Sequence, residues 1–204
     1  MLAVAVNGSP RKNGNTESLL KKVLKTLEEQ SWETEFIQLG GKPIRGCMAC
    51  SGCMKNRNMK CVVEDDCFND VMDRMLKADA IILGSPTYFT DVSAEMKALL
   101  DRSGYVALAN DCAFSGKIGA AVVAVRRGGA IHVYDTINHM FLMSRMVVPG
   151  STYWNFGIGL KRGEVESDDE GMANMVHLGQ SIAWLGKAIE PHKKDYPKSI
   201  ITEE

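Results

Sequence analysis

Four cysteines, Cys47, Cys50, Cys53 and Cys61, lie within fifteen consecutive positions of this 204-residue chain. The two-residue gaps between the first three let a tight turn direct successive sulfurs at a common point. Such a run is typical of the cysteines that hold iron–sulfur clusters in bacterial ferredoxins, whereas structural zinc usually takes two separated pairs. The spacing predicts one inorganic centre. An iron–sulfur cluster is the first interpretation, and zinc or free thiols are the alternatives.

A loop at 8–16 contains residues suited to binding a phosphate. Its glycines let several main-chain N–H groups point inward, and Ser9, Asn15 and Thr16 add short side-chain donors. The helix expected to follow adds its dipole, and Arg11 adds positive charge. The spacing is neither that of a dinucleotide fingerprint nor that of a P-loop. The alternative interpretation is a strand–helix turn with a surface arginine, capped by Thr16 or Asn15.

Two further loops contain groups suited to a planar heterocycle. The loop at 84–89 offers main-chain donors and carbonyls for the edge of a ring, while Tyr88 or Phe89 covers a face. The loop at 126–129, Arg-Arg-Gly-Gly, offers unhindered N–H groups beside positive charge, which would stabilise the negative charge of a reduced flavin. Taken singly, these loops are also explained by ordinary packing and by a solvated basic turn.

These loops connect apolar runs, expected to be strands, with amphipathic stretches, expected to be helices. The alternation occurs five times without repeats, which predicts a doubly wound, five-stranded parallel α/β sheet in a single domain spanning 1–204. Ligands of such sheets bind outside the carboxyl ends of the strands, so the loops after strands one, three and four are expected to meet. Residues 40–66, after strand two, form a cysteine-rich loop insertion. The expected strands are 2–6, 34–39, 78–83, 118–125 and 146–153. One expected helix begins near residue 16, and the others cover 68–77, 93–102, 131–145 and 168–190.

Composition restricts the class of protein. The formal net charge is -1 and hydrophobic residues make up 45% of the chain, so nothing indicates a nucleic-acid or membrane-surface partner. No apolar run reaches the length of a membrane span, and residues 1–6 lack the features of a signal peptide. A cytoplasmic protein is expected, in which clustered cysteines bind metal more often than they form disulfides. The polar tail from 191 onward is expected to fray.

Several other residues are expected to have structural roles. Asp65 and Asp66 precede a helix and are interpreted as caps rather than as catalytic groups. The pair Asp101–Arg102 is expected to close a helix and tie it to a neighbour through an ion pair. Cys67, at a helix start, and Cys112, in a loop, are interpreted as ordinary small residues.

The two glycine-rich loops carry a resemblance to a known family. Gly-Ser-Pro-Arg-x-x-Gly-Asn-Thr at 8–16 with Gly-Ser-Pro-Thr-Tyr at 84–88 resembles the flavodoxin-like, NAD(P)H-dependent FMN reductase family, and the added cysteines resemble its iron–sulfur flavoprotein branch. The resemblance implies a 4Fe–4S cluster on the four cysteines. It also implies dimers or dimers of dimers, with the cysteine loop of one subunit near the flavin of another. For the FMN phosphate, it implies binding by Ser9, Arg11, Asn13, Asn15 and Thr16. For the flavin ring, it implies a lining of Pro86, Thr87, Tyr88 and Phe89. Gly128 and Gly129, beside Arg126, would then close the pyrimidine side of the ring.

The resulting hypothesis is an FMN-dependent electron-transfer oxidoreductase that couples FMN to a 4Fe–4S cluster. No catalytic side chain is required, because the flavin carries the chemistry. NAD(P)H or reduced ferredoxin is the expected electron donor, and a redox partner protein or a small molecule is the expected acceptor. One alternative is an NAD(P)H-dependent FMN or quinone reductase whose cysteines are free or zinc-bound. The other is a non-enzymatic zinc-loop sensor of a phosphorylated ligand.

Overall fold

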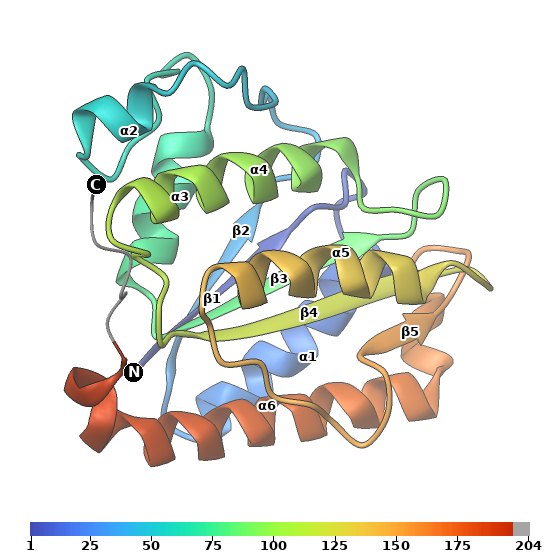
Figure 1. The fold of residues 1–204 in the computed structure, drawn as a ribbon. Helices are drawn as coiled ribbons and strands as arrows, with labels where there is room; N and C mark the ends of the chain where they lie inside the picture. Colours follow the sequence, from blue (N-terminus) through green and yellow to red (C-terminus); the bar gives the residue numbers. More distant parts are fainter. Residues whose placement is uncertain (198–204) are drawn as a thin grey trace.

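The computed structural model of the chain describes residues 1–197. At its centre is a five-stranded parallel sheet in the order β2-β1-β3-β4-β5. Figure 1 shows that helices cover both faces of the sheet. The predicted doubly wound, five-stranded parallel sheet is confirmed. The strands are β1 (Leu2–Asn7), β2 (Glu33–Gln38), β3 (Ala80–Pro86), β4 (Ile118–Val125) and β5 (Phe156–Ile158); α1 (Asn15–Glu29) and α6 (Asp169–Ile189) cover one face, and α3 (Phe68–Lys77), α4 (Ala94–Ala109) and α5 (Ala130–Met143) cover the other.

The sheet is covered on both faces because its central strands are apolar at almost every position. Successive side chains of a strand point to opposite faces. In β1, Ala3 and Ala5 lie in the core beneath α1 and α6, while Val4 and Val6 lie in the core beneath α3, α4 and α5. Strands β3 and β4 are buried along their whole length. Continuous apolar runs of this kind are therefore strands buried on both faces.

The fifth strand lies later in the chain than the sequence predicts. Residues 146–153 contribute a single isolated bridge to the start of β4, whereas β5 is the three-residue segment Phe156–Ile158, which pairs with the end of β4. Pro149 has no N–H to donate and Gly150 has no side chain to pack, so residues 146–153 fit poorly into a sheet. The prediction of a strand there is wrong for this reason.

The insertion at 40–66 is mostly irregular, as predicted, but it includes a five-residue helix, α2 (Gly52–Asn56). Helix α2 lies beside the C-terminal half of α4 (Figure 1). Helix α4 extends to Ala109, so Asp101 and Arg102 lie within it and do not close it as predicted. Among residues 1–197, no helix combines the length and the apolar character needed to cross a bilayer.

The segment that follows α6 is ordered as far as Asp195, which corrects the prediction of a frayed tail from 191 onward. The short 3-10 helix η2 (Glu190–Asp195) continues directly from α6. The Nζ of Lys193 lies 2.6 Å from the Oδ1 of Asp79, immediately before β3, and the Oδ2 of Asp79 accepts the main-chain N–H of Leu2. Asp79 therefore joins the C-terminal segment to β1 and β3. The end of the predicted tail, 198–204, lies outside the described residues.

Replacing Asp79 with asparagine is expected to lower the free energy of unfolding by about 1–3 kcal/mol at neutral pH, because a charge-assisted hydrogen bond is lost. Burial raises the pKa of Asp79, but the hydrogen bonds from Lys193 and Leu2 lower the pKa below its ordinary value. The stabilisation is therefore present above the ordinary pKa of about 3.9 and is lost as pH falls through the lowered folded value. Urea unfolding at pH 7 and at about pH 2.5 checks this: the two proteins should converge at low pH, and a constant difference would contradict the prediction.

Candidate cofactor-binding sites

The loops that leave β1, β3, β4 and β5 surround a cavity of about 180 Å³ at the carboxyl edge of the sheet. The strand order places the switch point between β1 and β3, where ligands bind in open α/β sheets. The structure thus brings the three predicted loops together, and their role in binding stays a prediction. The lining residues are Ser9, Arg11, Gly14, Asn15, Thr16, Pro86, Thr87, Tyr88, Ala124, Arg126, Gly159, Leu160, Lys161 and Arg162.

The first loop is fixed at its base by hydrogen bonds. The N–H of Ser9 donates to the Oδ1 of Asn7 (3.0 Å), and the Nε2 of Gln38 donates to the main-chain oxygen of Ser9 (2.7 Å). The hydroxyl of Ser93, the N-cap of α4, donates to the main-chain oxygen of Gly8 (2.7 Å). Because three neighbouring elements hold the loop, its shape is set before any ligand binds.

The amino end of α1 is uncapped and lines this cavity. The helix begins at Asn15, and its N-cap is Gly14, which has no side chain to accept a hydrogen bond from the first turn. The predicted capping by Asn15 or Thr16 is therefore wrong. The first N–H groups of a helix have no acceptor within the helix. An end of this kind, with Arg11 beside it, is suited to an anion such as a phosphate.

Four of the five residues predicted to hold the phosphate line the cavity, and Asn13 does not. Asn13 has a left-handed backbone (φ 53°), and its N–H donates to the Oε2 of Glu17 (2.6 Å). Asn15 lines the cavity, and its Oδ1 accepts the N–H of Val165 (3.4 Å). Asn13 therefore helps to shape the turn, while Asn15 connects it to the segment that follows β5.

The second and third loops touch each other. Pro86, Thr87 and Tyr88 line the cavity, and the buried hydroxyl of Thr87 has no hydrogen-bond partner among residues 1–197. Phe89 is fully exposed and lies outside the lining. A Cβ on Gly129 (φ 90°) would lie 3.2 Å from the Cγ2 of Thr87, so a larger residue there would push the two loops apart.

The third loop contributes one of its predicted residues to the lining. Arg126 lines the cavity, whereas Gly128 and Gly129 do not. A Cβ on Gly128 would meet nothing within 4 Å, so Gly128 stands in open space. These two glycines are therefore placed beside the cavity, at the start of α5, rather than in its wall.

A fourth loop, after β5, was missed by sequence reasoning. Gly159, Leu160, Lys161 and Arg162 line the same cavity. The main-chain N–H groups of Leu160 and Lys161 both donate to the Oε2 of Glu164 (2.7 Å each), and these bonds lower the pKa of Glu164. The adjacent charges of Lys161 and Arg162 could have indicated an anion-binding loop. The fifth strand was predicted at 146–153, however, so this pair was not expected to follow a strand directly. With Arg11 and Arg126 it makes the cavity strongly cationic.

Replacing Gly40 with alanine is expected to weaken FMN binding, because the first loop must move. A Cβ on Gly40 would lie 2.2 Å from the main-chain carbon of Ser9, which is closer than such atoms approach in proteins. A loss of affinity of at least about tenfold corresponds to 1.4 kcal/mol. Fluorescence titration with FMN measures it. Gly150→Ala is the control, since a Cβ there meets nothing within 4 Å; equal effects of the two variants would contradict the prediction.

A second cavity, of about 120 Å³, lies between the cysteine loop and the C-terminal half of α4. On the α4 side its lining includes Arg102, Tyr105 and Val106, and on the loop side it includes all four clustered cysteines, Cys47, Cys50, Cys53 and Cys61. Within the described part of the chain, no three His, Cys, Asp or Glu side chains are arranged as a site for a single metal ion. Four thiols around one small cavity are the donor set of a 4Fe–4S cluster.

Backbone geometry turns the cysteine loop around this cavity. Ala49 and Ser51 have positive φ angles of 52° and 57°, and the N–H of Ala49 donates to the Sγ of Cys47 (3.4 Å). Burial raises the pKa of Cys53, and the charges of Cys61 and Cys47 raise it further, while main-chain N–H groups lower it only in part. A bound metal would supply the positive charge that keeps these sulfurs deprotonated and offsets the repulsion between them.

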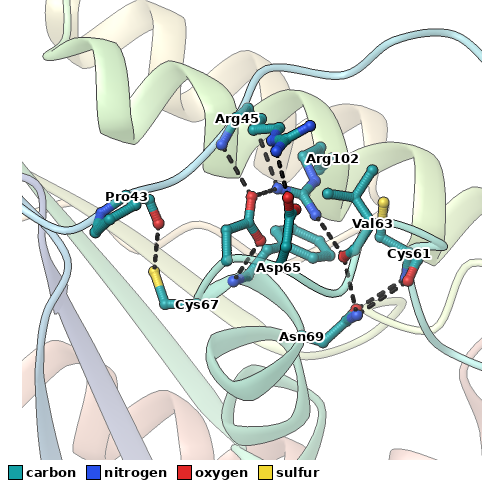
Figure 2. A network of polar contacts seen from close by, with 10 residues as sticks. Pro43, Arg45, Cys61, Val63, Asp65, Cys67, Asn69 and Arg102 are labelled. Atoms are coloured by element: carbon teal, nitrogen blue, oxygen red, sulfur yellow. Dashed lines mark hydrogen bonds and ion pairs between the residues drawn. The ribbon is translucent and has the colours of Figure 1, made fainter.

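Arg102, which lines the cysteine cavity, forms a buried ion pair, and Figure 2 shows Arg102 within its network of polar contacts. The Nη1 of Arg102 lies 2.5 Å from the Oδ2 of Asp66, and the two side chains are 1% and 2% exposed. Arg102 also donates to the main-chain oxygens of Arg45 and Val63 (3.2 Å each). Its guanidinium lies 4.1 Å from the centre of the Phe68 ring. Asp66 accepts the N–H of Phe68 as well, so it bonds to the first residue of α3 and also pairs with Arg102.

Cys61 is held against this network. Its N–H donates to the Oδ1 of Asn69, and the Nδ2 of Asn69 donates back to the main-chain oxygen of Cys61 (2.9 Å each; Figure 2). Burial lowers the pKa of Arg102, but Asp66 and Cys61 raise it above its ordinary value. Cys67 is the N-cap of α3 and Cys112 follows α4; neither lines the cavity.

The two cavities lie toward opposite ends of α4. The start of α4 touches the first loop through Ser93, whereas Tyr105 lines the cysteine cavity. Twelve residues of α-helix separate these two positions, or about 18 Å at 1.5 Å per residue. Figure 1 shows α2 beside the end of α4 that points away from the carboxyl edge of the sheet.

The sheet order, the uncapped helix end and the loops around it define a flavodoxin-like α/β protein. The crystal structure of a flavodoxin, WrbA-like protein from Agrobacterium tumefaciens has the same fold, with a TM-score of 0.65, 15% identity, and coverage of 92% of this chain and 98% of that one. The chain belongs to the NADPH-dependent FMN reductase family, whose model matches residues 1–161.

Two curated relatives place the chain within a branch of that family. An iron–sulfur flavoprotein of Methanocaldococcus jannaschii is 36% identical over 93% of this chain and 100% of its own length. An iron–sulfur flavoprotein of Methanosarcina thermophila is 29% identical over 95% of this chain and 99% of its own. The resemblance that the motifs indicated is thereby confirmed. The chain is an FMN-dependent oxidoreductase, which argues against the non-enzymatic sensor.

Proposed function

We propose that this oxidoreductase transfers electrons between FMN at the sheet edge and a 4Fe–4S cluster held by Cys47, Cys50, Cys53 and Cys61. The observation that carries the proposal is the single cavity lined by all four of these cysteines. The names of the two relatives, both iron–sulfur flavoproteins, support an iron–sulfur centre together with a flavin. When bound, FMN exchanges a hydride or single electrons and the cluster exchanges single electrons, so the pair converts between two-electron and one-electron donors.

The residues of the first loop are proposed to bind the phosphate of FMN. Ser9, Asn15 and Thr16 offer donors beside the uncapped start of α1, and Arg11 neutralises charge. Asn13 supports the turn through its bond with Glu17. Within the site these groups position the cofactor and keep its phosphate fixed.

The remaining loops are proposed to hold the flavin ring. Pro86, Thr87 and Tyr88 line the inner part of the site, and Arg126 supplies positive charge for the reduced state. The buried, unpartnered hydroxyl of Thr87 is a ready donor or acceptor for the ring edge. Phe89, Gly128 and Gly129 lie beyond the lining and are proposed to cover the outer edge of the ring.

We further propose a homodimer or homotetramer in which the cysteine loop of one subunit lies near the FMN of another. The support is the distance of about 18 Å along α4 between the two sites within one chain. NAD(P)H or reduced ferredoxin is the proposed donor, and a redox partner protein or small molecule the proposed acceptor. Exposed thiols at Cys47 and Cys50 fit a reducing compartment, so we propose a cytoplasmic location.

Anaerobic purification followed by an absorption spectrum, with iron, zinc, sulfide and FMN quantified on the same sample, tests the proposal. The expected result is FMN equimolar with the chain, and iron and acid-labile sulfide in the ratio of a 4Fe–4S cluster. Zinc without sulfide, with FMN present, would instead favour an NAD(P)H-dependent FMN or quinone reductase with a structural metal. Sedimentation of the same sample checks the oligomeric state.

A further inference from the structure

Among the described residues that line the cysteine cavity, Arg102 is the one with a permanent charge. The other described lining residues are apolar, uncharged polar, or the cysteines themselves. Arg102 is also 2% exposed, so water screens its charge weakly. A charge in this position acts on anything bound to the four sulfurs with little attenuation.

The guanidinium is held through both of its terminal nitrogens, whereas its Nε is not. Nη1 bonds to Asp66 and to the main-chain oxygen of Arg45, and Nη2 bonds to that of Val63. The Nε is buried and has no hydrogen-bond partner among residues 1–197. A buried N–H without an acceptor is costly and rare. Because Arg102 and Cys61 line the same cavity, a group bound there is the expected acceptor.

We propose that Arg102 sets the reduction potential of the cluster, through a hydrogen bond from its Nε to a sulfur beside Cys61 and through its charge. This inference rests on the proposed function. Reduction adds an electron to the cluster, so a donor and a nearby positive charge favour the reduced state and raise the potential. Asp66 offsets part of that charge, and Phe68 and the carbonyls fix its position.

The test is a redox titration of the cluster, followed by electron paramagnetic resonance, in wild type and in Arg102→Gln. The variant is expected to have a potential lower by at least about 59 mV, which is a tenfold change for one electron. Arg45→Gln is the matched control, because Arg45 is paired with Asp65 in the same network but is more than half exposed. Its potential should change far less. Equal potentials in Arg102→Gln and wild type would overturn the inference.

Asp66→Asn separates an electrostatic role from a structural one. It removes the negative partner while keeping Arg102, so the potential is expected to rise, opposite in sign to the Arg102→Gln shift. If Arg102→Gln fails to retain iron, this second variant decides: a higher potential supports the inference, and an equal or lower one overturns it. Loss of iron from both variants would assign Arg102 to assembly of the loop and overturn it too. An iron-free wild type would instead contradict the proposed function itself.

Discussion

Replacing Cys50 with serine is expected to abolish binding of iron and sulfide while FMN remains bound. Cys50 lies in the middle of the cysteine run and lines the cavity with the other three. Removing a residue that only hydrogen-bonds to a metal ligand lowers metal affinity by about 10–100-fold. Removing a ligand itself should therefore lower the affinity by more than about 100-fold. FMN should be unaffected, because its cavity lies toward the other end of α4. Iron and FMN are measured on the same anaerobic preparation.

The matched control is Cys112→Ser. Cys112 is partly buried and lies outside the cysteine cavity, so its loss removes a thiol without removing a proposed ligand. Wild-type iron content is expected in this variant. Full iron content in Cys50→Ser, or equal losses in the two variants, would show that the cavity is not the metal site.

Replacing Thr16 with aspartate is expected to lower the affinity for FMN by at least about 100-fold, or 2.7 kcal/mol. The new carboxylate would occupy the place proposed for the phosphate, repel it, and remove a hydroxyl donor. Thr16 is almost fully buried in the first turn of α1, where negative charge is favoured by the helix dipole. The fold should therefore tolerate the substitution. Fluorescence quenching of FMN during titration measures the loss.

Two comparisons make this result specific for the phosphate. Thr16→Ser keeps the hydroxyl and should bind FMN within about threefold of wild type. Riboflavin has the same ring without a phosphate, so its weaker binding should differ little between Thr16→Asp and wild type. A Thr16→Asp protein that binds FMN as wild type does would place the phosphate elsewhere.

Much of the fold follows from hydrophobic pattern alone. Strands β1, β3 and β4 are buried on both faces, so their apolar runs have only one reasonable interpretation. Strand β5 was misplaced because it has three residues at the sheet edge, too few for any period to emerge. Helix α4 was predicted too short because its later turns mix Gly104 and Tyr105 with small apolar residues, which weakens the amphipathic signal.

The site was predictable where it depends on local sequence and not where it depends on tertiary packing. Glycines and short donors after a buried strand are local signals, so the loops at 8–16 and 84–89 were found. Lys161 and Arg162 were missed because their relevance depends on the position of β5. The predicted ion pair to a neighbouring element is confirmed, because Arg102 pairs with Asp66. The burial of Arg102 beside the cysteine cavity was not predicted, because an arginine within a helix is ordinarily exposed; only the fold brings Asp66 and Phe68 around it.

The most direct test of the account is X-ray diffraction from anaerobically grown crystals containing FMN, with anomalous data collected on both sides of the iron absorption edge. The account predicts phosphate density at the start of α1 beside Arg11, and an iron signal enclosed by Cys47, Cys50, Cys53 and Cys61. An empty first loop, or an anomalous signal that is absent at the iron edge and present at the zinc edge, would contradict it.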